Sequence, residues 1–150
     1  MTDVALRYDA DLGICDIALD GGLVATDDGL RTAVLISLFT DARARDDDPL
    51  PQPGGDRRGW WGDAEPRVAG DETGSRLWLI EREKIVPDVL ARAREYAEAA
   101  LAWLVEERIA SAVAVEVEAI RPQTLAIGVT ITRPTGPARQ RFDFVWEATS

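Results

Sequence analysis

The sequence contains no histidine and only one cysteine, Cys15, among 150 residues. Histidine is the commonest general base and the commonest zinc ligand, so its absence removes the catalytic triads and most of the zinc sites that depend on it. One cysteine cannot form an internal disulfide, and we interpret Cys15 as a small buried hydrophobe. No phosphate-binding glycine loop and no dinucleotide fingerprint occurs. We therefore expect no enzymatic activity, with no catalytic, cofactor-binding or metal-binding residues.

Positive charge and long apolar runs are also scarce. Lys and Arg number 17 against 27 Asp and Glu, which gives a formal net charge of −10. An acidic surface repels phosphate backbones and anionic membranes, and the basic residues form short pairs rather than a stripe, so we expect no nucleic-acid partner. No run reaches the roughly 18 apolar residues of a spanning helix. The first residues lack a basic segment followed by an apolar stretch, so we expect no signal peptide. We expect no membrane partner, and a location in a cytoplasm or in a particle assembled there.

Hydrophobic periodicity predicts an α+β fold in a single domain, residues 1–150. Residues 4–26 are predicted to form short strands, with a hairpin turn at Asp20-Gly21-Gly22. Three helical segments are predicted after them. They run from caps at Thr26-Asp27-Asp28 to about Ala44, from a cap at Ser75 to Lys84, and from Pro87 to about Ile109.

The last forty residues switch to the period of two that is typical of strands. Each of three strands has one apolar face, made by Val113, Val115, Val117 and Ala119, by Leu125, Ile127, Val129 and Ile131, and by Phe142, Phe144 and Trp146. Turns are predicted at Arg121-Pro122-Gln123 and Pro134-Thr135-Gly136-Pro137. The predicted architecture is an N-terminal β-hairpin and two main helices packed on a C-terminal three-stranded antiparallel meander.

Residues 45–74 show neither period and are rich in proline and glycine, which predicts a long loop; loops of this length are usually functional or disordered. At its centre lies Asp56-Arg57-Arg58-Gly59-Trp60-Trp61-Gly62-Asp63. Trp and Arg dominate the energetics of protein interfaces, so this string favours a protein contact. The alternative is that the Trp pair plugs the core of the domain while the arginines pair with Asp56 and Asp63. Both interpretations hold if one Trp side chain packs in the core and the other points to a partner.

Two carboxylate patterns suggest other chemistry. Asp9 and Asp11, with Asp20 at the twelfth position, resemble a calcium loop, but Ile14 stands where glycine is required, so a solvated turn is favoured. Asp63 and Glu65 lie beside the Trp pair, and two carboxylates suffice for glycoside hydrolysis. Because 27 acidic residues make such pairs common, a sugar-active hydrolase is only an alternative.

Several segments together resemble one family, the gene product forty-six family of Mu-like phage baseplate proteins. They are Asp16-Ile17-Ala18-Leu19, Thr26-Asp27-Asp28-Gly29-Leu30-Arg31-Thr32-Ala33-Val34, Ile36-Ser37-Leu38-Phe39-Thr40-Asp41, the Arg-Arg-Gly-Trp-Trp-Gly-Asp string, and Gly74-Ser75-Arg76-Leu77-Trp78-Leu79-Ile80-Glu81-Arg82. The family resembles the sheath-initiator wedge proteins of contractile tails. The resemblance implies a virion structural protein of the inner baseplate, with other wedge proteins, the tail tube and the sheath as partners. A soluble adaptor or regulatory protein-binding module of the same fold is an alternative, and self-association is left open.

The final strand suggests how such a protein would act. An exposed sheet edge offers unpaired N–H and C=O groups to another chain, and the resemblance implies that sheath subunits supply the added strand. The alternative is an edge strand that only closes the core. The predicted interface residues are Arg57, Arg58, Trp60, Trp61, Phe142, Phe144 and Trp146.

Overall fold

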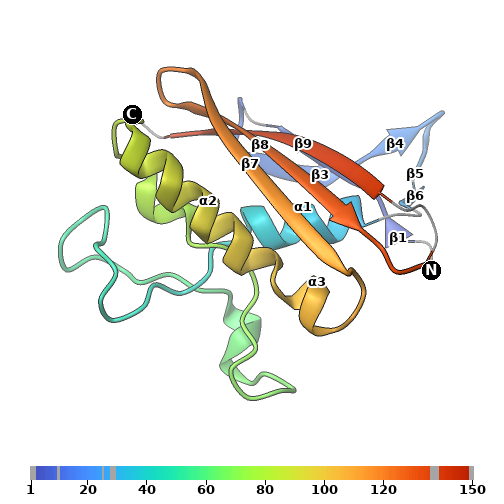
Figure 1. Cartoon of the computed structure of the whole chain (residues 1–150), viewed down its shortest axis with the longest axis horizontal. Coiled ribbons are helices and arrows are strands. Elements are labelled where there is room, and N and C mark those ends of the chain that lie inside the picture. The colour runs from blue at the N-terminus through green and yellow to red at the C-terminus, as the bar shows by residue number, and fades with distance from the viewer. Residues whose placement is uncertain (1–2, 10, 25, 28–29, 136–138, 149–150) are drawn as a thin grey trace.

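A computed structural model describes residues 3–9, 11–24, 26–27, 30–135 and 139–148 (Figure 1). The described elements are β1 (Asp3–Val4), β2 (Leu6–Asp9), β3 (Ile14–Ile17), β4 (Leu19–Asp20), β5 (Leu23–Val24), β6 (Thr26–Asp27), α1 (Arg31–Phe39), η1 (Trp61–Ala64), η2 (Leu77–Ile80), α2 (Pro87–Leu101), α3 (Trp103–Glu106), β7 (Ala112–Arg121), β8 (Thr124–Thr132) and β9 (Arg139–Glu147). Short hairpins precede the helices, and a three-stranded sheet follows them. This order confirms the predicted α+β class.

The C-terminal sheet has the strand order β7-β8-β9, and both strand pairs are antiparallel. The side chains of β8 that face the helices are fully buried at 0% exposure: Leu125, Ile127, Val129 and Ile131. Alternate residues of a strand point to opposite faces, so the period of two in the sequence places all four in one layer. The predicted meander is confirmed. Its last turn includes Gly136 and Pro137, which lie outside the described residues.

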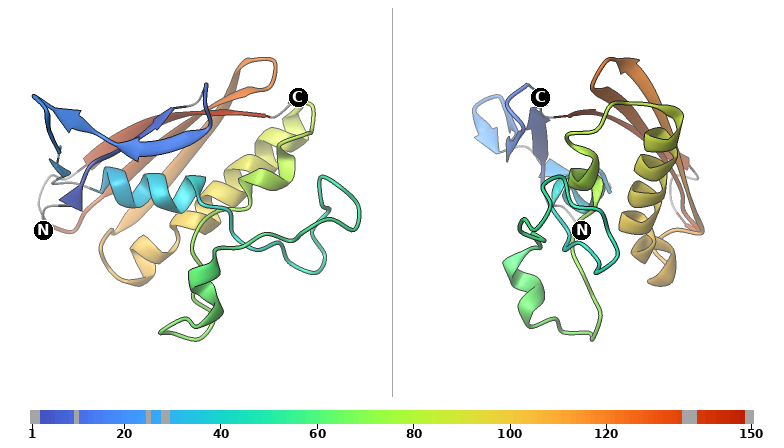
Figure 2. Two further views of the ribbon diagram at one scale, coloured as in Figure 1. Left: turned by 180° about the vertical axis from the view of Figure 1, so that it is seen from behind. Right: turned by 90° about the vertical axis from the view of Figure 1, so that its left-hand side faces the viewer.

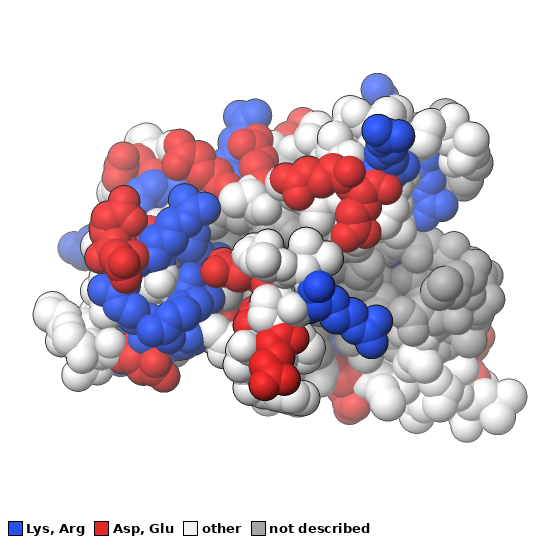
Figure 3. Space-filling model, turned by 90° about the horizontal axis from the view of Figure 1, so that it is seen from below, with Lys and Arg blue, Asp and Glu red and all other residues white. Residues whose placement is uncertain are grey.

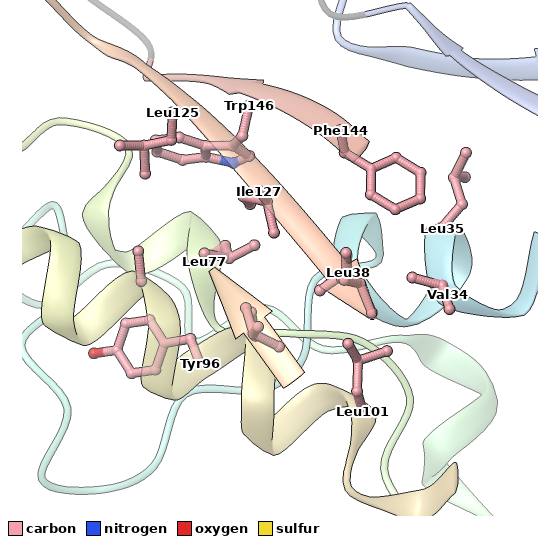
Figure 4. Close-up of a cluster of buried hydrophobic side chains, with 14 of the residues drawn as sticks. Val34, Leu35, Leu38, Leu77, Tyr96, Leu101, Leu125, Ile127, Phe144 and Trp146 are labelled. Carbon is pink, nitrogen blue, oxygen red and sulfur yellow. The ribbon is translucent and has the colours of Figure 1, made fainter. Parts of the chain in front are cut away.

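The core lies between this sheet and the helices. Figure 4 shows Phe144 of β9 facing Val34 and Leu35 of α1, while Trp146 lies beside Leu125. All five residues are buried. Burying a large apolar side chain contributes about 1.5–3 kcal/mol, so this layer is the main source of stability.

Helix α2 crosses the sheet and packs closely on β7 (Figure 1). Pro87 occupies its first turn, as predicted, where the missing N–H costs no helical hydrogen bond. The apolar stripe is buried from Ala93 through Ala97 to Leu101, and it continues to Leu104 in α3. Ala102 separates the two helices.

Helix α1 is shorter than predicted, and its end is set by a residue far away in the sequence. The chain turns extended at Thr40, and the Ser75 N–H donates to the Thr40 oxygen at 2.8 Å. The Ala42 N–H in turn donates to the Ser75 oxygen at 2.9 Å. Gly74 has φ +105°, and a Cβ there would collide with the Thr40 carbonyl. The prediction that this helix extends to about Ala44 was therefore wrong.

The predicted start of α1 and the Ser75 helix also need correction. Thr26 and Asp27 lie in β6, Asp28 lies outside the described residues, and α1 begins after Leu30 without a side-chain cap. The Ser75 hydroxyl donates to the Leu38 oxygen at 2.5 Å instead of capping a long helix. Only the short 3-10 helix η2 follows it.

The N-terminal strands form two-stranded ribbons at the end of the molecule away from the 45–74 segment (Figures 1 and 2). The predicted turn is confirmed, since Gly21 and Gly22 join β4 to β5 with φ of +57° and +82°. Tyr8 of β2 stacks on Phe39 with ring centroids 4.0 Å apart, which fixes the β2–β3 ribbon to the body. Cys15 of β3 is exposed, so its prediction as a buried hydrophobe was wrong.

The helices of the described residues are all too short or too polar to cross a membrane.

Candidate protein-interaction surfaces

Arg58 fastens the 45–74 segment to the body. Its guanidinium forms ion pairs with Asp41 and Glu81, each at 2.9 Å, and lies 4.5 Å from the ring centroid of the buried Trp78. Burial alone would lower the pKa of Arg58, but hydrogen bonds and charges from Asp41 and Glu81 outweigh it and raise the pKa overall. These contacts occupy the guanidinium group, so Arg58 holds the loop in place.

Arg57 has a similar role on the other side of the backbone. Its carbonyl accepts a hydrogen bond from the Ala44 N–H at 2.8 Å, and its guanidinium donates to the carbonyl of Arg45. The Asp56 carboxylate accepts from the Arg58 N–H at 3.1 Å rather than from an arginine side chain. The predicted ion pairs with Asp56 and Asp63 are therefore wrong for Arg58. Its partners, Asp41 and Glu81, lie outside the string.

Trp60 and Trp61 project from this anchored loop. Their side chains are 42% and 83% exposed, and their ring centroids lie 5.3 Å apart. Trp60 lies over Gly62, where any Cβ would collide with the indole ring. The Asp63 carboxylate accepts the Thr73 N–H at 3.0 Å and closes the loop behind the pair. Neither indole enters the core, so the pair forms an exposed aromatic knob, Trp60–Trp61.

The core instead uses two other tryptophans, Trp78 and Trp146. The indole N–H of Trp78 donates to the Ala42 oxygen at 2.7 Å, which satisfies its only polar atom.

Figure 3 shows the face of the molecule seen from below in the view of Figure 1. Lys and Arg side chains gather there toward one end, with acidic side chains around them.

Strand β9 offers its backbone edge rather than its apolar side chains. Phe144 and Trp146 are buried and Phe142 is half-buried, so their side chains close the core. The Ala148 N–H donates to the Gln123 oxygen at 2.7 Å, in register with the β8–β9 ladder. Because hydrogen-bonded pairs alternate along an antiparallel ladder, the N–H and C=O groups of Val145 point away from β8. No strand among the described residues pairs with this outer edge.

The face of the sheet opposite the core carries an ion-pair bridge. Arg141 of β9 reaches Glu116 of β7 at 3.0 Å and its neighbour Asp143 at 3.1 Å. Gly128 of β8 lies beneath, where a Cβ would come within 2.6 Å of the Arg141 guanidinium. The glycine thus permits the arginine to span the middle strand.

Two of the carboxylates considered for other chemistry, Asp9 and Asp63, have local structural partners. The Asp9 carboxylate accepts the N–H groups of Asp11 and Leu12 at 3.0 and 3.1 Å, so it stabilises its own turn. No group of three His, Cys, Asp or Glu residues that could hold a metal occurs within the described parts of the chain. Asp63 is engaged with Thr73, and Glu65 is exposed.

One surface escaped the sequence analysis. Seven large apolar side chains of the first 24 residues are exposed: Val4, Leu12, Ile14, Ile17, Leu19, Leu23 and Val24. The sequence feature that could have indicated this surface is the stretch from Asp9 to Val24, which mixes apolar and acidic residues and contains no Lys or Arg.

The described residues form an α+β fold with a sheet edge that no described strand pairs and an exposed Trp pair. Both features are typical of proteins that bind other proteins. Residues 30–138 match the family model described as Phage protein GP46. The chain belongs to the gp46 family of Mu-like phage baseplate proteins. Membership confirms the resemblance drawn from the sequence, and the family is a structural rather than an enzymatic one.

Two relatives illustrate the similarity. Baseplate protein gp46 of Escherichia phage Mu is 48% identical over 136 residues, which span 91% of this chain and 90% of that protein. The Mu-like prophage FluMu protein gp46 of Haemophilus influenzae is 36% identical over 141 residues, or 94% of each chain.

Proposed function

We propose that this chain is a wedge component of a contractile phage-tail baseplate and that it nucleates the tail sheath. The named baseplate role of the phage Mu relative, across nearly the whole of both chains, supports the first part. The open edge of β9 supports the second. The partners we propose are other wedge proteins, the tail tube and the first ring of sheath subunits.

The observation that carries the proposal is the geometry of β9. Its inner side chains pack in the core, so the strand is held in a continuous register against β8. Its outward N–H and C=O groups are presented at a fixed spacing, which is what an incoming strand needs to extend a sheet. A preorganised edge spares the complex much of the ordering entropy that a flexible segment would lose.

The same strand is protected from casual aggregation. Its outer face carries Arg141, Asp143 and Glu147, and charged side chains on an edge strand disfavour pairing with arbitrary partners. Within the chain Arg141 pairs with Glu116 and Asp143, and Glu147 pairs with Arg121. A sheath strand with matching charges would exchange with these surface partners. In this proposal the charges select the partner while the backbone supplies the binding.

The aromatic knob is the second proposed contact. Trp60 and Trp61 are presented by a loop that Arg57 and Arg58 hold in place. Truncating such an anchor typically costs about 2–4 kcal/mol of binding. Helix η1, which begins at Trp61, lies on the side of the molecule away from the C-terminal sheet (Figure 2), so a wedge neighbour can bind there while sheath binds β9.

Replacing Val145 with proline tests the sheath role. Proline removes an N–H that points away from β8, and edge strands tolerate it. We expect Val145→Pro to enter baseplates but to yield few tails with assembled sheath, as counted by electron microscopy. Val145→Thr keeps the N–H and is the matched control, with normal sheaths expected.

The proposal is contradicted if folded Val145→Pro, verified by circular dichroism, supports sheath assembly at the level of the control. Mass spectrometry of purified particles separates the adaptor alternative. A structural wedge protein must be present in every particle preparation, whereas an adaptor that acts on a host protein would be lost on purification.

A further inference from the structure

The N-terminal ribbons expose more apolar surface than the rest of the molecule does for its length. Leu12, Leu19 and Leu23 are 70%, 69% and 76% exposed. All four residues of β3 are exposed, which is unusual for a strand of sequence Ile-Cys-Asp-Ile. Contiguous exposed apolar surface on a soluble chain marks an interaction site.

The β2–β3 ribbon has one anchored strand and one free strand. Leu6 and Tyr8 of β2 pack against the core. Their cross-strand partners are Ile17 and Cys15 of β3, which share the same face but remain exposed. The apolar face therefore continues past the part that the body covers. It ends at β3, whose outer side pairs with no other described strand.

The backbone of β3 is available along this outer edge. The Ala18 N–H donates to the Ala5 oxygen at 2.9 Å, in register with the β2–β3 ladder. The alternation of an antiparallel ladder then points the N–H groups of Cys15 and Ile17 away from β2. The Asp16 carboxylate accepts the Ile17 N–H at 2.7 Å, so a flexible acidic group occupies this donor of the edge.

The charge of the region selects the partner. Residues 9–24 contain four aspartates and no Lys or Arg. A cationic side chain on an incoming strand would attract the Asp16 carboxylate and free the Ile17 N–H for a ladder bond. Within the ribbon the cross-strand partner of Asp16 is Arg7 of β2. A second copy of β3 on the outer edge would instead bring aspartate against aspartate, which disfavours pairing.

We infer that β3 is a docking edge for an extended segment of another protein in which basic and apolar residues alternate. The basic residues face Asp16, and the apolar residues extend the layer formed by Cys15 and Ile17. This edge is distinct from β9, which lies in another sheet. That the donor is a neighbouring baseplate subunit rests on the proposed function; the recognition chemistry does not.

The lone cysteine provides a direct readout. Cys15 is exposed in β3 and is the only cysteine in the sequence, so its alkylation by iodoacetamide reports whether the edge is covered. The probe is a blocked seven-residue peptide of alternating Lys and Val, and its match carries Glu in place of Lys. We expect the Lys peptide at about ten times its Kd to slow alkylation of the full chain about tenfold. The Glu peptide should leave the rate unchanged.

Two variants separate this edge from general attraction to an acidic protein. Asp16→Lys should abolish protection by the Lys peptide, whereas Asp143→Lys, an equal charge change on the exposed face of β9, should retain it. Thermal melting verifies that both variants are folded. Val145→Pro should also retain protection, so a failure of sheath nucleation at β9 and a failure of docking at β3 give different results.

The inference is overturned if the Lys peptide gives no protection, if both peptides protect equally, or if Asp143→Lys loses protection as Asp16→Lys does. It is also overturned if protection rises with protein concentration alone and sedimentation shows a dimer, because the occupant would then be a second copy.

Discussion

Strands β8 and β3 are both rich in apolar residues but have opposite surroundings. The apolar side chains Leu125, Ile127, Val129 and Ile131 of β8 are completely buried between two strands and the helices. Ile14 and Ile17 of β3 are half exposed, on a ribbon with one free edge. Apolar composition alone therefore does not place a strand in the core. Length, a central place in a sheet and a helix layer on one face decide it.

Tryptophan substitutions should give the largest contrast. Trp78→Ala removes a buried indole with a 2.7 Å hydrogen bond to Ala42 and should cost about 3–5 kcal/mol of unfolding free energy. Trp61→Ala removes an exposed indole and should change that free energy by less than about 0.5 kcal/mol. Urea unfolding measures both. Equal losses in the two variants would mean that the knob is part of the core.

The strand comparison itself is tested by Ile127→Ala in β8 and Leu23→Ala in β5. Ile127 is fully buried, so its loss leaves a cavity and should cost about 2–5 kcal/mol. Leu23 is 76% exposed, and its substitution should cost less than about 0.5 kcal/mol. A large loss for Leu23→Ala would show that the ribbon is covered by the chain itself, contrary to its assignment as a partner surface.

The loop anchor should give an intermediate effect. Arg58→Ala removes two ion pairs and the contact with the Trp78 ring, and partial exposure keeps the expected loss at about 1–2 kcal/mol. Arg67→Ala, at an exposed position of the same segment, is the control and should be neutral. Limited proteolysis of the 45–74 segment should accelerate only in Arg58→Ala. Equal cleavage in the two variants would remove Arg58 from its role as anchor.

The smallest effect is a pH dependence from Asp48. Burial alone would raise its pKa, but hydrogen bonds from the Arg45 N–H and the Arg76 guanidinium, at 2.8 Å each, lower the pKa overall. A lowered pKa in the folded state stabilises the protein above the unfolded value of about 3.9, and this contribution is lost as the pH falls further.

Unfolding free energies of the wild type and Asp48→Asn should therefore differ by a constant amount between about pH 5 and 7. The difference should shrink below about pH 4, because the carboxylate of the unfolded chain is protonated there before the native one, and the loss is complete once the pH has fallen through the lowered native pKa. A difference that does not change with pH would mean that the ionised carboxylate of Asp48 is not what stabilises the loop.

Local periodicity was sufficient for the meander and for α2. The alternation from Leu125 to Ile131 and the spacing from Ala93 to Leu101 each depend on neighbours within one element. The end of α1 was missed because Thr40 is held by Ser75, 35 positions later in the sequence. No local pattern encodes a contact of that kind.

The same contrast between local patterns and long-range contacts applies to the candidate surfaces. Composition identified the Trp-Arg string, but the partners of Arg58 are Asp41 and Glu81, which come from segments on either side of the loop. Phe144 and Trp146 were predicted at an interface because their strand was expected to present an open backbone edge. The structure places their side chains in the core, which leaves the backbone of the strand as the predicted contact. The edge position of β9 followed from the predicted meander, and the strand order β7-β8-β9 agrees with it.

The most direct test of the baseplate account is a reconstruction by electron cryomicroscopy of the contractile particle that contains this chain. The account predicts an additional strand from a sheath subunit along the outer edge of β9, hydrogen-bonded at Val145. An outer edge of β9 that faces solvent, or that is covered by a helix with no backbone ladder, would contradict it.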